Sequence, residues 1–307
     1  MAVSKCVKLT GALTQELLKS VDNVLFDCDG VLWHGDSAIA GASEVVKLLR
    51  KKNKRVFFVT NNSTKTQELY AQKLCKMGFE AVKEEVFGTA HCTALYLKQV
   101  ACFNGGKVYL IGGKALSEEL DKVGISYVGP GPDPVFGGMS DWASVPLDPD
   151  VKAVVVGFDE HFSYLKLTKA LCYLKDPGCL FIGTNTDTKL PLEGGRAVPG
   201  TGCLIRAVET AVNRKAIIIG KPSKFIYDCV VSKYGVDPAR TVMVGDRLDT
   251  DILLGSNCNL KTVLTLTGVT SLVEAQSCAA SNCPEERRLA PDFYIDTIGD
   301  LLPALQG

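Results

Sequence analysis

The segment Val24-Leu25-Phe26-Asp27-Cys28-Asp29-Gly30-Val31 places two carboxylates, two residues apart, directly after a short apolar strand. At the carboxyl end of a buried parallel strand, side chains open into the crevice where α/β sheets bind their ligands. Two carboxylates a few ångströms apart repel each other, so one must bind a proton or both must share a cation. The segment therefore predicts a parallel α/β fold with a cation site at one edge of its sheet.

Short β-branched runs alternate with longer amphipathic stretches along the chain, which is typical of a parallel sheet covered by helices on both faces. We predict strands at 24–26, 56–59, 108–111, 153–156, 180–182, 216–219, 241–244, 262–266 and 293–295. Helices are expected at 43–52 and 64–77, the second with Ser63 as its N-cap and with Leu69, Leu74 and Met77 facing inward. The stretch 129–149, rich in Gly and Pro, predicts a surface excursion.

Composition excludes several classes of protein. With 34 basic and 34 acidic residues among 307, the chain shows no charge bias toward nucleic acid or an anionic membrane. It has no apolar run of the roughly 18 residues that a membrane span needs, and Met1 to Ser20 lacks the apolar core of a signal peptide, so we expect a cytoplasmic protein. The 12 cysteines lack CxxC spacing and predict reduced, mostly buried thiols.

Polar residues follow four of the predicted strands. Each group taken alone fits a turn or a helix cap, but four such groups at strand ends favour one joint site. Hydroxyls, amides and free N–H groups at the start of a helix also suit an anion. The four groups are Asp27 with Asp29, Thr60-Asn61-Asn62-Ser63, Gly220-Lys221-Pro222, and Gly245-Asp246-Arg247-Leu248-Asp249-Thr250-Asp251.

In this order, Asp27-x-Asp29-Gly30-Val31, Thr60, Lys221 and Gly245-Asp246-x-x-x-x-Asp251 resemble the motifs of the haloacid dehalogenase-like phosphatases. The long interval between Thr60 and Lys221 resembles the large C2-type cap of one branch of that family. The resemblance implies a Rossmann-like parallel-sheet core formed by 1–105 and 215–307, with an inserted α/β cap domain at 106–214. It also implies a homodimer formed through the cap.

Charge suggests the mechanism. A phosphate dianion that approaches a carboxylate is repelled by about 4 kcal/mol per charge pair at 4 Å and an effective dielectric constant of 20, so a cation must offset it. Mg²⁺ prefers oxygen ligands, which Asp27 and Asp246 supply, and the resemblance adds the Asp29 backbone carbonyl. Asp27 is then the nucleophile that forms an aspartyl-phosphate, and Asp29 is the general acid and base.

The remaining site residues support this chemistry. We expect Thr60 and Asn61, with Asn62 beside them, to bind the phosphoryl oxygens, and Lys221 to neutralise charge and hold Asp27 ionised. Asp251 is expected to orient metal-bound water or Lys221. Asp249 is interpreted as solvated or supporting, and Arg247 has no assigned role.

The stretches 158–164, 199–202 and 244–253 extend the resemblance over nearly the whole chain, toward the branch that hydrolyses 2-phosphoglycolate and glycerol-3-phosphate. The loop 185–193 is the expected specificity loop, with Leu190 where the related pyridoxal branch carries a ring-contacting histidine. Pyridoxal 5′-phosphate or protein phosphotyrosine remain alternative substrates, and a catalytically silent phospho-ligand-binding regulator remains an alternative class. His161 is interpreted as a packed or capping histidine, and Cys28 as an inert packed thiol whose pKa the two flanking carboxylates raise.

Overall fold

A computed structural model describes residues 5–134, 136–191 and 196–307. The chain divides into two compact units. The first comprises the residues up to Thr60, Gln67–Phe87 and Lys221–Gly307, and the second comprises Asn61–Thr66 and Gly88–Gly220. Each unit is built around its own sheet and is described separately below. The predicted insert of 106–214 lies within the second unit.

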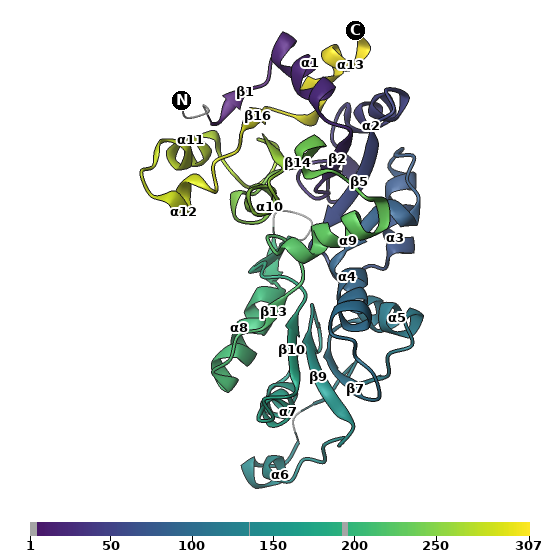
Figure 1. Cartoon of the computed structure of the whole chain (residues 1–307). Coiled ribbons are helices and arrows are strands. Elements are labelled where there is room, and N and C mark those ends of the chain that lie inside the picture. The colour runs from purple at the N-terminus through teal and green to yellow at the C-terminus, as the bar shows by residue number, and fades with distance from the viewer. Residues whose placement is uncertain (1–4, 135, 192–195) are drawn as a thin grey trace. The chain divides into compact units, whose positions relative to one another are not determined.

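The first unit is built on a seven-stranded sheet in the order β1-β16-β15-β14-β2-β5-β6, in which β14, β2 and β5 are neighbours (Figure 1). Each of its strand pairs with a described register is parallel. Its strands are β1 (Val7–Lys8), β2 (Asn23–Phe26), β5 (Arg55–Thr60), β6 (Val86–Gly88), β14 (Thr241–Gly245), β15 (Lys261–Thr265) and β16 (Phe293–Ile295), beside the hairpin β3 (Trp33–His34) and β4 (Ser37–Ala38).

Helix α2 (Ala42–Lys51) illustrates how the helices of this unit form. Ala42, Val45, Val46 and Leu49 recur at helical spacing, and all four are buried. Glu44 in the first turn and two basic residues in the last turn complement the helix dipole. The other helices are α1 (Gly11–Ser20), α3 (Gln67–Lys76), η1 (Lys83–Glu85), α9 (Lys224–Tyr234), η4 (Pro238–Arg240), η5 (Leu248–Ile252), α10 (Leu253–Cys258), α11 (Leu272–Ala280), α12 (Pro284–Arg287), η6 (Ile298–Leu301) and α13 (Leu302–Gln306).

The prediction for 64–77 was partly wrong. Helix α3 begins at Gln67, so Ser63 is not its N-cap. Asn62 instead accepts hydrogen bonds from the backbone N–H and the hydroxyl of Thr64, and this local turn competes with helix formation. Leu69 is 44 % exposed rather than inward, because residues four apart share a face of a helix, so Tyr70 lies with Leu74 on the buried face and Leu69 does not.

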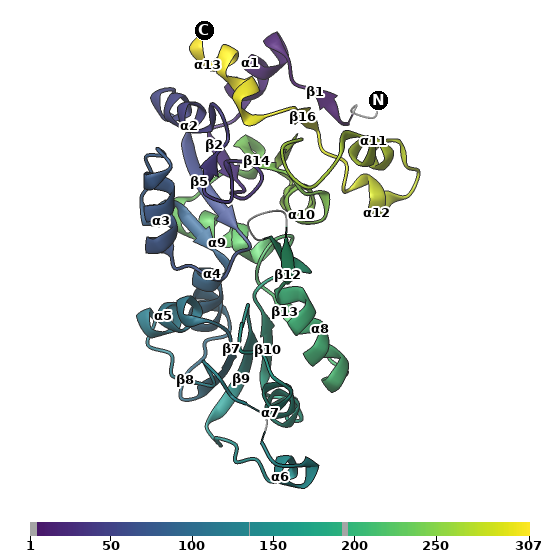
Figure 2. The ribbon, with the colours of Figure 1, turned by 180° about the vertical axis from the view of Figure 1, so that it is seen from behind.

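The second unit has a five-stranded sheet in the order β13-β10-β9-β7-β8, whose pairs are all parallel; Figure 2 shows β9 between β7 and β10. An antiparallel pair, β11 and β12, lies outside it. The strands are β7 (Lys107–Ile111), β8 (Tyr127–Val128), β9 (Val151–Val156), β10 (Leu180–Gly183), β11 (Lys189–Pro191), β12 (Ala197–Pro199) and β13 (Ile217–Ile218), and the helices are α4 (Thr89–Leu95), η2 (Tyr96–Val100), α5 (Lys114–Lys122), α6 (Met139–Ala143), α7 (Tyr164–Leu174) and α8 (Thr201–Val212).

All of the predicted strands are confirmed, with ends shifted by at most a residue or two, and the α/β class with a parallel core is confirmed with them. The described part of 129–149 is mostly exposed, as predicted, although it also forms the short helix α6. Fewer than half of the cysteines are buried, so that expectation was too strong, but all are free thiols. Within the described ranges, no helix has the length and apolar character needed to cross a membrane.

Candidate active site

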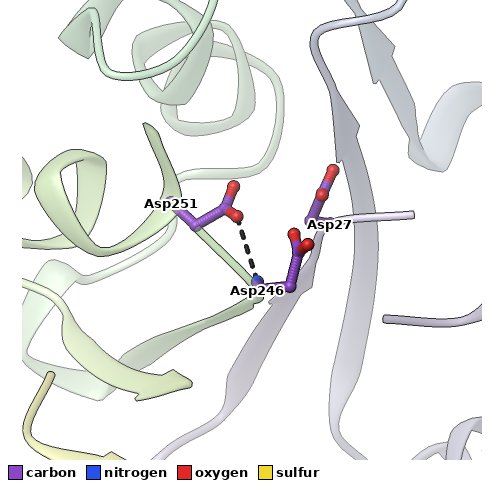
Figure 3. A group of neighbouring side chains, drawn as sticks. All are labelled: Asp27, Asp246 and Asp251. Atoms are coloured by element: carbon purple, nitrogen blue, oxygen red, sulfur yellow. Dashed lines mark hydrogen bonds between the residues drawn. The ribbon is translucent and has the colours of Figure 1, made fainter. Parts of the chain in front are cut away.

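Asp27 and Asp246 leave the first sheet at neighbouring positions of the same edge. Strand β2 ends at Phe26, which pairs with Val244 of β14, and the Asp27 N–H extends this ladder by donating to the Val244 carbonyl at 2.9 Å. Asp251, on the turn after β14, joins them (Figure 3). One ligand atom from each of the three carboxylates lies within 4.8 Å of the others, and all three residues are buried.

Lys221 supplies the positive charge of this group. Its Nζ lies 2.6 Å from Asp27 Oδ1 and 2.8 Å from Asp251 Oδ1, and it donates to the Val59 carbonyl at 3.0 Å. The lysine side chain is only 2 % exposed, so these partners replace the water that an ammonium would otherwise bind. Asp251 is held in turn by the backbone N–H groups of Asp246 and Arg247, which donate to its Oδ2 at 3.2 and 3.1 Å.

Backbone approaches Asp246 closely from two sides. A Cβ at Gly268 would lie 1.9 Å from Asp246 Oδ2, and one at Gly30, where φ is +84°, would lie 2.7 Å from it. The Val269 N–H donates to that same oxygen at 2.8 Å. Asp246 Oδ1 is buried without a hydrogen-bond partner in the described part of the chain. An orphaned carboxylate oxygen among two further carboxylates fits a hard divalent cation such as Mg²⁺.

The electrostatics of the group agree with that fit. Burial, then Asp27 and then Asp251, raise the pKa of Asp246 to about 8. Burial raises the pKa of Asp251 to about 6 against the opposing effect of Lys221, and burial likewise raises the pKa of Asp27 despite Lys221. Burial alone would lower the pKa of Lys221, but Asp251 and Asp27 outweigh it and raise that pKa. Three carboxylates therefore share one ammonium, and a divalent cation would restore neutrality.

Asp29 and Thr60 occupy the same sheet edge. Asp29 is exposed, unlike Asp27, and its Oδ1 accepts a hydrogen bond from the indole Nε1 of Trp33 at 2.8 Å. Thr60, the last residue of β5, is buried, and its hydroxyl lies 3.4 Å from the Tyr70 hydroxyl. The first unit thus brings together the predicted residues Asp27, Asp29, Thr60, Lys221, Asp246 and Asp251.

The other predicted binding residues belong to the second unit. Asn61 is buried, and its Nδ2 donates to Asp187 Oδ1 at 3.4 Å. Asn185 donates to the other oxygen of Asp187 at 2.9 Å. Asn62 forms the turn with Thr64 described above, and Leu190 lies in β11, paired with Val198. Two residues of the predicted specificity loop, Leu192 and Glu193, lie outside the described residues.

Three other expectations can be compared with the structure. Burial, followed by Asp27 and Asp29, raises the pKa of the Cys28 thiol well above its usual range, as the flanking carboxylates led us to expect. Asp249 is exposed and pairs with Arg247 at 2.8 Å. His161 is not packed as expected, because its side chain is 43 % exposed and lies 3.5 Å from Glu160.

Sequence reasoning missed two features of the site. The first is the loop after β15, where Thr267 donates to the Gly30 carbonyl at 2.6 Å and Gly268 and Val269 enclose Asp246. The sequence could have indicated this loop, because it follows the predicted strand 262–266 of the same sheet. The second is Trp33, whose contact with Asp29 no spacing rule would reveal.

A parallel α/β sheet with buried carboxylates and one lysine at its carboxyl edge defines a haloacid dehalogenase-like hydrolase. The chain belongs to this family: residues 24–126 match the family of haloacid dehalogenase-like hydrolases, and residues 218–301 match a family described as HAD-hydrolase-like.

Relatives cover the chain almost completely. It is 57 % identical to human glycerol-3-phosphate phosphatase, over 99 % of this chain and 97 % of that protein. It is 42 % identical to human chronophin, over 99 % of this chain and all of that protein. Among solved structures, a 4-nitrophenylphosphatase from Thermotoga maritima is 31 % identical with a TM-score of 0.76, covering 94 % of this chain and 99 % of the other. A glycerol phosphate phosphatase from Mycobacterium tuberculosis, solved with magnesium, is 28 % identical with a TM-score of 0.74, covering 93 % of this chain and 78 % of the other.

Proposed function

We propose that this chain is a Mg²⁺-dependent phosphatase of small phosphomonoesters, with glycerol-3-phosphate and 2-phosphoglycolate as its preferred substrates. The observation that carries the proposal is the pairing of the buried Asp27 carboxylate with Lys221 at 2.6 Å, beside the orphaned oxygen of Asp246. The 57 % identity to a glycerol-3-phosphate phosphatase over nearly the whole chain supports the substrate class.

The side chains of Asp27 and Asp246 would hold Mg²⁺, together with the Asp29 carbonyl that the family resemblance implies. When bound, this ion supplies positive charge that offsets the repulsion between the phosphate and the carboxylates. Lys221 fixes the Asp27 carboxylate through Oδ1 and favours its ionised form against the effect of burial. Asp251 is the second anionic partner of Lys221, with its Oδ1 2.8 Å from the lysine Nζ.

Asp27 attacks phosphorus, so that a bond forms between its carboxylate oxygen and phosphorus while the ester bond to the leaving oxygen breaks. Asp29 gives its proton to that leaving oxygen. As a carboxylate, Asp29 then takes a proton from the water that attacks the aspartyl-phosphate, and Asp27 is released with inorganic phosphate. Thr60, Asn61 and Asn62 are proposed to donate to the phosphoryl oxygens.

The proposal extends to the second unit. The insert at 106–214 is proposed to act as the cap domain that selects the organic part of the substrate, with Leu190 on its specificity loop. Family resemblance supports this assignment, and it also supports a homodimer formed through the cap. A cytoplasmic location is part of the same proposal and rests on composition alone. Sedimentation of the purified protein tests the dimer separately from the activity.

The deciding experiment measures phosphate release from glycerol-3-phosphate, 2-phosphoglycolate and pyridoxal 5′-phosphate, with Mg²⁺ or with chelator, for the wild type and Asp27→Asn. We expect Mg²⁺-dependent release from the first two esters and none from the variant. A rapid acid quench during turnover should trap a protein-bound phosphate that hydroxylamine removes, and Asp27→Asn should lack it.

The other outcomes separate the alternatives. A preference for pyridoxal 5′-phosphate would change the substrate assignment and leave the mechanism standing. If no ester is hydrolysed while inorganic phosphate still binds, the chain is a phospho-ligand-binding regulator and the proposed activity is refuted.

A further inference from the structure

Trp33 is fully buried and contacts Asp29, the exposed proton donor of the proposed reaction. The indole is 0 % exposed, and its Nε1 donates to Asp29 Oδ1 at 2.8 Å. A buried indole N–H needs an acceptor, and here that acceptor is a carboxylate, which makes the hydrogen bond charge-assisted. An exposed aspartate samples several rotamers unless something holds it, so this contact restricts the direction in which Asp29 points.

The indole ring itself cannot move easily. It lies between Tyr70 and Phe79, with ring centroids 6.4 and 6.3 Å away, and both of these residues are buried. The turn that carries Asp29 and Trp33 is closed by its own backbone, because the Gly30 N–H donates to the Trp33 carbonyl at 2.8 Å. The carboxylate is therefore tied to a rigid part of the core.

Lys73 of α3 also contacts the ring. Its Nζ lies 4.7 Å from the centroid of Trp33, within the range of a cation–π contact. The same ammonium donates to the Gly35 carbonyl at 2.9 Å and lies 3.9 Å from Asp36, both in the tight turn between β3 and β4. Lys73 thus fastens both the indole and the hairpin that follows it to helix α3.

The indole N–H of Trp33 gives the two carboxyl oxygens of Asp29 different roles. An indole N–H can only donate a hydrogen bond, so the oxygen that it contacts, Oδ1, must act as an acceptor. The carbonyl oxygen of a carboxyl group is a better acceptor than its hydroxyl oxygen, so this contact favours Oδ2 as the oxygen that carries the transferred proton. Since a general acid works only when it is directed at the atom it protonates, the orientation of Asp29 controls its contribution to the rate.

We propose that Trp33 is a positioning residue that holds Asp29 by Oδ1 and directs Oδ2 toward the leaving oxygen, and that Lys73 keeps the indole in place. The inference rests on the proposed function, because it assumes that Asp29 protonates the leaving group. It adds to that function a residue that does not itself touch the substrate.

The test compares two esters that differ in their need for an acid. The alkoxide released from glycerol-3-phosphate is a poor leaving group and requires protonation, whereas 4-nitrophenolate leaves readily without it. For Trp33→Phe, we expect kcat/KM for glycerol-3-phosphate to fall at least about tenfold, toward the 10²- to 10⁴-fold that a general acid contributes. For 4-nitrophenyl phosphate we expect little change.

The ratio of the two kcat/KM values is insensitive to damage of the fold, because loss of folded protein lowers both equally. Asp29→Asn should shift the ratio in the same direction, and Trp33→Phe should add nothing in that background. Lys73→Met should reproduce part of the shift, and Lys73→Arg, which keeps a cation over the ring, should restore the wild-type ratio.

The matched control is Trp142→Phe, which removes the other tryptophan of the chain and its hydrogen bond to the Phe136 carbonyl at 2.8 Å. This variant should leave the ratio unchanged. If Trp33→Phe does not fold, a benzothienylalanine at position 33, in the Trp142→Phe background, removes the N–H while keeping the shape of the ring.

The outcomes are distinct. An equal fall for both esters, or no fall for either, would overturn the positioning role while leaving the proposed phosphatase intact. Absence of turnover by the wild type on both esters would instead refute the proposed function itself.

Discussion

Replacing Lys221 by Met should leave two carboxylates buried without their shared cation. In the wild type, Lys221 Nζ lies 2.6 Å from Asp27 Oδ1 and 2.8 Å from Asp251 Oδ1, and the lysine is 2 % exposed. Removing one partner of a buried ion pair typically costs about 3–5 kcal/mol of the free energy of unfolding. Because two carboxylates lose their partner here, we expect the upper part of that range at pH 8 for the metal-free protein.

The free energy of unfolding that Lys221→Met loses should grow as the pH rises. The pKa values of Asp27 and Asp251 are already raised in the folded wild type, and they rise further without Lys221. The folded state then binds protons that the unfolded state releases, so the free energy of unfolding falls as pH increases above about 4, by up to about 1.4 kcal/mol per pH unit for each proton. Lys221→Met should be less destabilised at pH 5 than at pH 8.

The assay is urea unfolding of metal-free protein at both pH values, followed by circular dichroism. Adding Asp251→Asn to Lys221→Met should recover part of the free energy of unfolding that Lys221→Met loses. The coupling energy between the two substitutions should be about 0.5–3 kcal/mol. A cost below about 1 kcal/mol, or one that does not change with pH, would refute the reasoning that this lysine compensates buried charge.

A second buried ion pair provides the control. Lys166 is 0 % exposed and lies 2.5 Å from Asp159, within the second unit. Lys166→Met should cost a similar amount of stability but leave turnover per folded molecule unchanged. Lys221→Met should also lower that turnover, by about 10²–10³-fold if it stabilises the reacting phosphate.

Three further predictions concern the proposed metal ligand Asp246, the neighbouring Gly268 and the expected specificity residue Leu190. Asp246→Asn should stabilise the metal-free protein at pH 8, because burial and Asp27 hold the pKa of this carboxyl at about 8, and should abolish the stabilisation by Mg²⁺ in thermal unfolding. Gly268→Ala places a Cβ 1.9 Å from Asp246 Oδ2 and should raise the Mg²⁺ concentration that half-maximal turnover requires. Gly113→Ala, whose added Cβ would have its nearest neighbour at 3.7 Å, should leave that concentration unchanged. Leu190→His should raise turnover of pyridoxal 5′-phosphate relative to glycerol-3-phosphate in a steady-state comparison, and an unchanged ratio would remove Leu190 from the specificity assignment.

Local patterns predicted the strands well because each strand is a short run of β-branched and aromatic residues between turn formers. The same reasoning failed at the start of α3, where Asn62 forms a turn with Thr64 that competes with the helix. Leu69 is exposed for a separate reason, because Tyr70 and not Leu69 shares a helix face with the buried Leu74. Capping preferences are small energies, so a neighbouring turn can override them.

Although Lys221 follows β13 of the five-stranded sheet, the sequence by itself determined that Asp27, Thr60 and Asp246 follow strands of one parallel sheet. This is enough to predict a common edge, because the carboxyl ends of parallel strands all point the same way. The motif spacing also indicated the family, which the relatives then confirmed. These inferences need only the local pattern of residues and the direction of the strands.

Only the tertiary structure decided which groups touch. Strand β14 lies beside β2 although more than 200 residues separate them, and that adjacency sets Asp246 next to Asp27. The pairing of Lys221 with both Asp27 and Asp251, and of Trp33 with Asp29, depends on distances of 2.6 to 2.8 Å. Hydrogen bonds and ion pairs weaken steeply beyond such distances, so their partners are decided by strand order and side-chain packing, which no local pattern contains.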